Sequence, residues 1–440
     1  MQVEMLLPYE RMIALEELRS FLTGTPSATP FHESVMSATV DLSQRIFHDL
    51  EARDHPELLV LAYWMRKAEI SRLTTQFCSL QLERRVLTPR GLVFHLPPRN
   101  VDTIFVYSWL LAALTGNRSV IRISSQRSEG TNILLRLLRE TLTAAGHPAS
   151  SGTTIVSYGH EEEPTKMLSA VCDVRVIWGG DQTVEIIRRS PLAPHAKEIT
   201  FPDRYSLAVI RAGAYEVLPE EKRDYLADQF FNDSFWFDQL ACSSPRLVVW
   251  CGTGSEARAA SADFFLRLAG CVERRRYLVP AAAAIQKLVY ACSAILSSPV
   301  EECRRYKGFS VLTLNCLADF PRAHPGGGLF FEAYLENLLE LTAFLSRRDQ
   351  TLTWFGFTPE ELHALVRSLN GCAIDRIVPI GQALQFHRFW DGYDLLQEFC
   401  RCVYIEPTFL DASPAQPRTL GNPEQTHFRS NGLKPARNRS

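Results

Sequence analysis

Short β-rich runs between residues 92 and 178 alternate with segments long enough for helices, and this alternation limits the folds open to the chain. The runs cover residues 92–96, 119–123, 153–157 and 174–178. Strands that alternate with helices at this interval form right-handed crossovers and a parallel sheet with helices on both faces. The sequence therefore predicts an α/β domain whose ligands bind beyond the carboxyl ends of the strands.

A second α/β unit is predicted after residue 206. Residues 207–210 and 247–250 are its first strands, with a long helix near 220–239 between them. Before the first sheet, apolar residues recur at helical spacing, which predicts a helical N-terminal region. After about residue 407 the chain contains Pro, Gly, Asn, Ser and Gln with few apolar residues, so this tail is expected to be disordered.

Small or polar residues follow the predicted strands of the first unit. They are Pro97-Pro98-Arg99-Asn100, Ser124-Ser125, Gly159 and Gly179-Gly180. Such residues leave the backbone open to a ligand and outline a dinucleotide site. The G-x-G-x-x-G fingerprint is missing, so the motif does not support an ordinary Rossmann dehydrogenase.

Cys242 stands where the long helix breaks, just before the apolar run 247–250. A thiol at such a break is accessible to a substrate, and its thiolate is the nucleophilic form. From the residues alone, Cys242 also fits a buried structural thiol, because free cysteine usually packs as a small hydrophobe.

Composition excludes several other classes of protein. The chain has 440 residues, a net charge of -2 and no long basic run, which gives no electrostatic reason to expect nucleic acid. Its 11 cysteines lack C-x-x-C spacing and fit free thiols in a reducing cytoplasm, with no metal site predicted. The start lacks a secretory signal pattern, and the apolar stretch around 104–114 is too short to span a membrane.

Seven stretches in register between residues 92 and 405 carry a resemblance to a known family. The chain resembles the acyl-CoA reductase component of bacterial luminescence fatty acid reductase complexes, within the aldehyde dehydrogenase superfamily. The matching stretches are Pro98-Arg99-Asn100-Val101, Gly116 to Arg122, Gln239 to Pro245, Gly326 to Glu332, Asp349 to Thr353, Arg376 to Gly381, and Trp390 to Asp394.

The resemblance implies two Rossmann-like α/β domains, an N-terminal helical region and a C-terminal oligomerisation strand. The expected boundaries are an N-terminal region at 1–90, an NADP-binding domain at 91–205, a catalytic domain at 206–385, a C-terminal segment at 386–406 and a tail at 407–440. The implied reaction is the NADPH-dependent reduction of a fatty acyl thioester to an aldehyde.

In that reaction Cys242 carries the acyl group, because thiolate attack on a thioester exchanges one thioester for another. Each addition to the carbonyl creates an oxyanion, which needs fixed hydrogen-bond donors. The resemblance assigns this task to the Asn100 side chain and the backbone N–H of Cys242. The ordinary alternative for Asn100 is a helix cap ahead of Val101.

The resemblance also implies cofactor-binding residues. Arg122 stands where relatives often have lysine, and its fork would bind the 2′-phosphate of NADPH; otherwise it is a surface cation. Ser124, Gly179 and Gly180 would approach the nucleotide, although a strand-to-helix turn needs the same freedom. Glu332 matches a glutamate that holds the nicotinamide ribose, and a helix-start carboxylate is its alternative.

Glu198 occupies the position of the superfamily's general base, but the glycines that normally follow it are replaced by Ile199 to Asp203. A reductase must protect its acyl-enzyme from water, so Glu198 would instead relay a proton to or from the thiol. His324, ahead of the glycine run, would serve as an acid or contact a carrier; a buried histidine with satisfied ring nitrogens is the alternative.

The expected substrate is an acyl-CoA or an acyl group on a carrier, and an acyl-protein synthetase is a potential partner. Phe235, Trp236 and Phe237 would line an acyl tunnel or belong to the core. Residues 401–405 offer a sheet edge for a homo-oligomer. Two alternatives stay open: an oxidative or CoA-acylating aldehyde dehydrogenase, and a scaffold partner of an acyl-protein synthetase.

Overall fold

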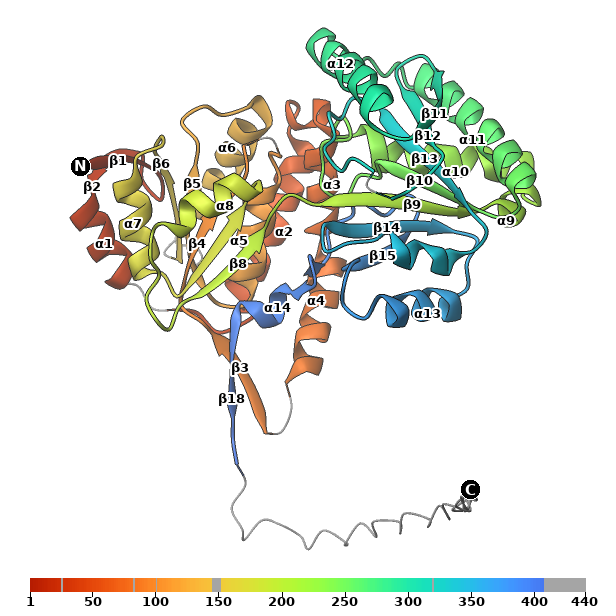
Figure 1. Cartoon of the computed structure of the whole chain (residues 1–440). Coiled ribbons are helices and arrows are strands. Elements are labelled where there is room, and N and C mark those ends of the chain that lie inside the picture. Colours follow the sequence, from red (N-terminus) through yellow and green to blue (C-terminus); the bar gives the residue numbers. More distant parts are fainter. Residues whose placement is uncertain (25–26, 82–83, 100, 145–151, 319, 407–440) are drawn as a thin grey trace, which may run out of the picture.

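A computed structural model describes residues 1–440 except 25–26, 82–83, 100, 145–151, 319 and 407–440. The described chain forms two lobes, each built around a seven-stranded sheet, with helices α2 to α4 between them (Figure 1). Asn100 and the predicted tail lie outside the described residues. No helix in the described ranges has the length and apolar character needed to cross a membrane.

The first sheet has the strand order β2-β1-β6-β5-β4-β7-β8 and is parallel from β6 to β8. Its strands are β1 (Gln2–Leu7), β2 (Arg11–Ala14), β4 (Leu92–Leu96), β5 (Arg118–Ile123), β6 (Thr153–Ser157), β7 (Val174–Trp178) and β8 (Lys197–Phe201). Its helices are α1 (Leu15–Gly24), α5 (Ile104–Leu114), α6 (Glu129–Thr143), α7 (Glu162–Val171) and α8 (Asp181–Arg188). The strand order changes direction at β4, where open α/β sheets form their ligand crevice.

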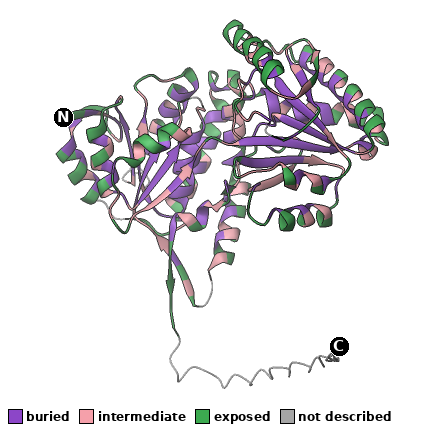
Figure 2. Cartoon of the chain, viewed as in Figure 1, coloured by how far each residue is buried: buried purple, intermediate pink, exposed green. Residues whose placement is uncertain are grey.

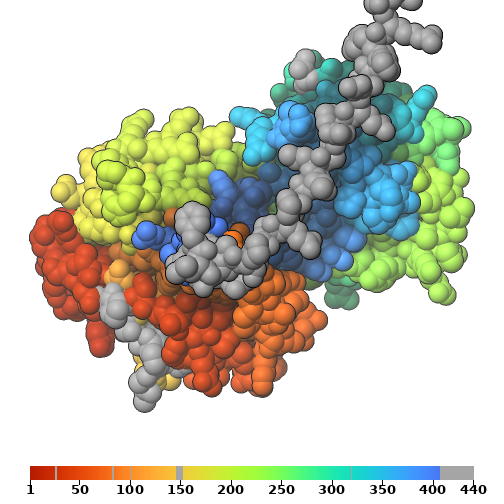
Figure 3. Space-filling view, turned by 90° about the horizontal axis from the view of Figure 1, so that it is seen from below, coloured from red at the N-terminus to blue at the C-terminus, as the bar shows by residue number. Residues whose placement is uncertain are grey.

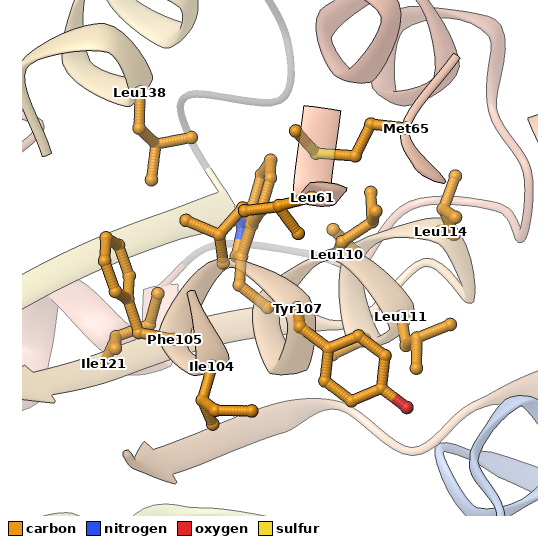
Figure 4. Close-up of a cluster of buried hydrophobic side chains, with 14 of the residues drawn as sticks. Leu61, Met65, Ile104, Phe105, Tyr107, Leu110, Leu111, Leu114, Ile121 and Leu138 are labelled. Carbon is orange, nitrogen blue, oxygen red and sulfur yellow. The ribbon is translucent and has the colours of Figure 1, made fainter. Parts of the chain in front are cut away.

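Burial on both faces explains why the central strands were predictable. Strands β4, β6 and β7 are buried at every position, and all three have the predicted bounds. Helix α5 is also buried all round; its side chains pack against Leu61, Met65, Ile121 and Leu138 (Figure 4). A parallel sheet covered on both faces reads as such continuous apolar runs.

The N-terminal region corrects one expectation. Strands β1 and β2 precede the helices and extend the first sheet, with β1 antiparallel to β6. The helices that follow are α2 (Glu33–His48), α3 (Pro56–Trp64) and α4 (Lys67–Leu80), with the short 3-10 helix η1 (Ala52–Asp54). Strand β1 was not predicted, because its buried and exposed residues alternate only in its first half.

The second sheet has the order β11-β12-β13-β10-β9-β14-β15 and is parallel except for β11. Its strands are β9 (Tyr205–Arg211), β10 (Leu247–Cys251), β11 (Val300–Arg305), β12 (Ser310–Leu314), β13 (Leu329–Leu335), β14 (Asp349–Phe355) and β15 (Arg376–Pro379). Its helices are α9 (Ala212–Glu216), α10 (Glu220–Phe235), α11 (Gly254–Arg274), α12 (Ala281–Ser297), η3 (Leu338–Ala343) and α13 (Pro359–Leu369). Figure 2 shows both sheets buried and the outer helix faces exposed.

The C-terminal segment returns from the second lobe to the first. It forms the hairpin β16 (Phe389–Trp390) and β17 (Tyr393–Asp394), helix α14 (Leu395–Glu398) and strand β18 (Cys400–Tyr404). Strand β18 pairs antiparallel with β3 (Arg85–Pro89) in a ribbon that projects from the molecule (Figure 1). Seen from below, this C-terminal segment, drawn in blue, lies between the two lobes (Figure 3).

Candidate active site

A cavity of about 550 Å³ lies between the two lobes. The first sheet contributes residues from the carboxyl ends of its strands, including Gly179 and Gly180. The second sheet contributes residues that precede its strands, among them Cys242 and Arg246. Cys242, in the second lobe, therefore faces the first lobe across the cavity, as expected from its place ahead of β10.

The loop that carries Cys242 has a constrained backbone. After α10 ends, Asp238 and Gln239 have left-handed φ values of 50° and 61°. The buried Gln239 amide donates to the Pro245 carbonyl at 3.0 Å and closes the loop. Ser206 Oγ donates to the Cys242 carbonyl at 2.6 Å, which ties the loop to β9. Strained backbone held by such contacts is typical of active sites.

The glycine run 326–328 supports this loop. All three glycines have positive φ, and Gly327 N donates to the Asp238 carbonyl at 2.7 Å. A Cβ on Gly326 would lie 2.7 Å from that same carbonyl oxygen, so only glycine fits there. His324 lines the cavity, but its Nδ1 accepts from Gly326 N at 3.0 Å and its Nε2 bonds the Leu329 carbonyl.

Both ring nitrogens of His324 are therefore engaged. Burial, with help from the Arg246 charge, lowers the pKa of His324 to about 3, so the ring is neutral at physiological pH. A neutral imidazole that accepts at Nδ1 carries its hydrogen on Nε2. The structure thus agrees with the alternative of a satisfied histidine that shapes the glycine run.

The environment of the Cys242 thiol keeps it protonated at neutral pH. Burial is the largest cause, and with the nearby Asp391 carboxylate it raises the pKa of Cys242 to about 11. The Arg246 charge and the nearby polar groups of Gln350 and Trp390 act in the opposite direction. A nucleophile in this state needs its thiolate to be stabilised when it reacts.

Three residues beside the thiol were missed as site residues. Asp391 and Trp390 come from the β16–β17 hairpin, and Gln350 comes from β14. Burial raises the pKa of Asp391 to about 6, and its carboxylate accepts a hydrogen bond from Gln350 Nε2. Their motifs were visible in the sequence, but only the fold places these distant segments against Cys242.

The structure does not bring Glu198 to the thiol. Its carboxylate forms ion pairs with Arg175 at 2.5 Å and with Arg188 at 2.7 Å, and Arg175 also donates to Ser169 and Ser190. Glu198 does not line the cavity. The expected proton relay is therefore corrected: this side chain of β8 neutralises a buried arginine.

Glu332 is also placed away from the cavity. It is fully buried in the middle of β13, where it forms an ion pair with Arg304. Ser261 Oγ and Thr313 Oγ1 donate to the same carboxylate. The predicted contact with a nicotinamide ribose is not supported, because Arg304, Ser261 and Thr313 all belong to the second lobe and none lines the Cys242 cavity.

The other predicted cofactor residues lie along one groove. Gly179 and Gly180 line the Cys242 cavity, whereas Arg122 and Ser124 line a smaller adjoining pocket. The two pockets share Pro98 and Val101. Arg122 Nη2 donates to the carbonyls of Tyr158 at 3.0 Å and Gly159 at 2.6 Å, which fixes its guanidinium at the strand ends.

A groove of about 930 Å³ borders the Cys242 cavity. We call it the α3–α10 groove; charged Arg66, Glu69, Arg72 and Asp233 line part of it, and its apolar lining is Phe47, Pro56, Leu59, Val60, Tyr63, Trp64, Ala68, Trp236, Leu384 and Phe386. Leu384 and Phe386 line both hollows, so they form the wall between them. Of the predicted tunnel residues, Trp236 lines the groove, Phe237 lines the cavity and Phe235 is buried in the core.

No group of three or more metal-ligating side chains was found in the described ranges. The cavity instead contains the groups of a thiol site: the Cys242 thiol, potential hydrogen-bond donors such as Arg246 and Trp390, and the Asp391 carboxylate. Exposed and buried cysteines elsewhere in the described chain are all free thiols. Cys242 is distinguished from them by its place at the cavity.

Comparison with known proteins confirms the resemblance that the motifs indicate. The model of the family described as acyl-CoA reductase (LuxC) matches residues 80–296. A long-chain acyl-protein thioester reductase from Aliivibrio fischeri is 26% identical over 245 residues, which cover 55% of this chain and 46% of that protein. One from Photorhabdus laumondii is 22% identical and is covered over 58% of its length. The chain thus spans about half the length of these relatives.

Solved structures confirm the aldehyde dehydrogenase-like fold. A putative aldehyde dehydrogenase from Burkholderia cenocepacia matches with a TM-score of 0.64 at 14% identity, covering 92% of this chain and 96% of that one. A glyceraldehyde-3-phosphate dehydrogenase from Methanocaldococcus jannaschii, complexed with NADP, gives a TM-score of 0.60 at 11% identity, with 89% and 92% covered.

Proposed function

Because the chain is similar to the acyl-CoA reductases, we propose that it reduces a long-chain fatty acyl thioester to the aldehyde through an acyl group on Cys242. The observation that carries this proposal is the place of Cys242 in a cavity that shares lining residues with two further hollows, the pocket at Arg122 and the α3–α10 groove. Such an arrangement lets a cofactor and an apolar chain approach the same atom from different sides.

Cys242 Sγ would attack the acyl carbonyl and expel the thiolate of the donor, which then takes a proton. The acyl group is now held as a thioester in a cavity of apolar and charged side chains. After reduction, the carbon–sulfur bond breaks, the aldehyde leaves and the Cys242 thiolate is protonated again. We keep the Cys242 backbone N–H and Asn100 as the proposed oxyanion donors.

Reduced nicotinamide, proposed as NADPH, would supply the hydride. Gly179 and Gly180 line the cavity just beyond the carboxyl end of β7, where we place this cofactor. Glycine at both positions leaves the backbone open to a close ligand. Arg122 and Ser124 would hold the distal phosphate end of the nucleotide, where the fork of Arg122 favours NADPH.

The α3–α10 groove would hold the acyl chain. Its apolar wall continues to Leu384 and Phe386, which border the thiol cavity. Each methylene of the acyl chain that is buried in the groove contributes roughly 0.8 kcal/mol to the binding free energy, so a groove of this size favours long acyl chains. The donor is proposed to be an acyl-protein or an acyl-CoA, since the relatives named above are acyl-protein thioester reductases.

One observation favours a reductase over a hydrolytic aldehyde dehydrogenase. The carboxylate expected at the general-base position, Glu198, is engaged by Arg175 and Arg188 and lies outside the cavity. Glu198 is therefore not available to activate water against the acyl-enzyme. The thioester then persists until hydride arrives.

Mass spectrometry of the intact protein tests this proposal. The chain and its Cys242→Ala variant are incubated with acetyl-CoA, decanoyl-CoA and tetradecanoyl-CoA, then with NADPH. We expect an acyl adduct that requires Cys242 and disappears with release of aldehyde. Cys251→Ala is the matched control, because Cys251 is buried at the end of β10 away from the cavity.

The donor protein is tested in the same way. If no acyl-CoA gives an adduct, an acylated ligase is supplied instead. Failure of both donors to label Cys242 would reject the proposed reductase.

A further inference from the structure

Gln350 reaches the thiol through an irregularity in β14. Asp349 pairs with Tyr205 and Leu352 pairs with Leu207, so the register shifts between these pairs. Gln350 and Thr351 together oppose the single residue Ser206, which is the geometry of a β-bulge. Bulges turn a side chain out of the regular pleat and are frequent beside active sites. Gln350 is buried in this bulge, and its side chain lies near enough to Cys242 to favour the thiolate by lowering its pKa.

Ser206 connects the bulge to the nucleophile. Its hydroxyl donates to the Cys242 carbonyl at 2.6 Å and accepts from Thr351 N at 3.3 Å. The backbone of Cys242 and the backbone of the bulge are therefore held by the same side chain. The Asp375 N–H also donates to the Gln350 carbonyl at 2.8 Å. Asp375 directly precedes β15, so this bond holds the bulge from the side of β14 that faces away from β9.

Asp391 holds the Gln350 amide in one orientation. Asp391 and Gly392 form the two-residue turn between β16 and β17, with φ values of 49° and 78°. Positive φ at both positions is typical of a type I′ hairpin turn, which Asp-Gly sequences favour. This turn places the Asp391 carboxylate where it accepts a hydrogen bond from Gln350 Nε2.

A carboxylate only accepts hydrogen bonds, so it selects the NH₂ side of the amide. One hydrogen of Nε2 then points to Asp391, and the other is free to donate to a second acceptor. Gln350 Oε1 has no hydrogen-bond partner among the described residues. The pairing with Asp391 thus accounts for the direction of the amide.

We propose that Gln350 donates an N–H to the Cys242 thiolate as a catalytic residue, and that Asp391 is the positioning residue that orients this donor. Thiolate charge develops twice in the proposed reaction. It forms when the thiol loses its proton before attack, and again when the carbon–sulfur bond breaks and the electron pair returns to sulfur. A fixed N–H donor stabilises both states.

Alkylation of Cys242 by iodoacetamide at pH 9 tests the donor, with the labelled peptide followed by mass spectrometry. Removing the N–H in Gln350→Met is expected to slow alkylation about tenfold, because a hydrogen bond to a charged group changes the thiolate population by at least that factor. Gln397→Met is the matched control: Gln397 also donates to an aspartate, Asp394, at 2.8 Å, but on the surface. Equal rates in the two variants would overturn the proposed donor.

Two substitutions at Asp391 test the positioning role. Asp391→Asn and Asp391→Ala both remove the negative charge, but only asparagine retains an acceptor for Gln350 Nε2. We expect Cys242 in the asparagine variant to alkylate several-fold faster than in the alanine variant. Equal rates would show that Asp391 acts through charge alone and would overturn its positioning role. Circular dichroism melting curves check that both variants are folded.

This inference rests on the proposed function only in taking Cys242 as the nucleophile. The alkylation rates need neither an acyl donor nor a nucleotide. A failed Gln350 test therefore leaves the reductase proposal in place, and a missing acyl adduct leaves the alkylation result in place.

Discussion

At the scale of single residues, Asp233 shows how burial governs charge beside the site. It is fully buried on α10 and accepts hydrogen bonds from Gly381 N at 2.6 Å and Ala383 N at 2.9 Å. Burial raises the pKa of Asp233 to about 7, although both backbone donors and Arg376 favour the charged form. The loop that it anchors leads to Leu384 and Phe386, the wall between the two hollows.

The raised pKa of Asp233 predicts how stability depends on pH. Between about pH 4 and 7, the folded chain keeps a proton on Asp233 that the unfolded chain has released. The free energy of unfolding therefore falls as pH rises through this window, by on the order of 4 kcal/mol at most. The melting temperature of the unchanged chain should therefore fall from pH 5 to pH 8 relative to that of the Asp233→Asn variant.

Thermal melting across that pH range measures the difference. Asp41→Asn, a substitution at an exposed position, serves as the control. A constant difference between the unchanged chain and Asp233→Asn would contradict the assigned burial effect.

The position of a site residue was predictable only where a local feature of the sequence determines it. Cys242 was placed correctly ahead of β10, because a helix break before an apolar run is a local feature. Glu198 and Glu332 were assigned by motif alignment, but which face of a strand meets the cavity depends on packing between sheets. Gln350 depends on a bulge, which leaves no local signature.

At the scale of elements, α3 and α10 form the walls of the apolar groove. Helix α3 starts with proline at its first turn and carries Leu59, Val60 and Tyr63 toward the groove. Helix α10 contributes Asp233 and, just after its end, Trp236. Helix α3 was expected from its apolar spacing and α10 as the long segment between two strands. Their approach to each other was not expected, since it depends on the fold of two separate lobes.

Filling the groove should alter the preference for chain length. Val60→Trp places a larger side chain in the groove and is expected to reduce acylation by tetradecanoyl-CoA more than tenfold, while acylation by acetyl-CoA stays unchanged. Rates of adduct formation on Cys242 measure both. Val217→Trp, at a position 81% exposed, is the control for the added indole. Equal loss for both chain lengths would place the acyl chain elsewhere.

At the scale of the whole molecule, the ribbon of β3 and β18 extends beyond both lobes (Figure 1). Four of its apolar residues are exposed: Val86, Val403, Tyr404 and Ile405. Strand β18 pairs with β3 on one side, and its other edge meets no strand in the described ranges. An unpaired apolar edge of this kind favours association with another chain.

The ribbon is therefore the proposed contact between subunits. Val403→Lys should reduce the molar mass in solution, measured by size-exclusion chromatography with light scattering, because a buried lysine disfavours strand pairing. Val217→Lys introduces the same charge on the second lobe and should leave the mass unchanged. The same mass in both variants would rule out the ribbon as the contact.

The late return of the C-terminal segment has a consequence for biosynthesis. Trp390 and Asp391 leave the ribosome about 150 residues after Cys242. At translation rates of about 5 to 20 residues per second, the nascent chain carries its thiol for roughly 7 to 30 s before these neighbours exist. During that interval both sheets can form, but the thiol lacks the hairpin that surrounds it in the finished protein. The order of synthesis thus completes the surroundings of Cys242 only after the strands of both sheets have been made.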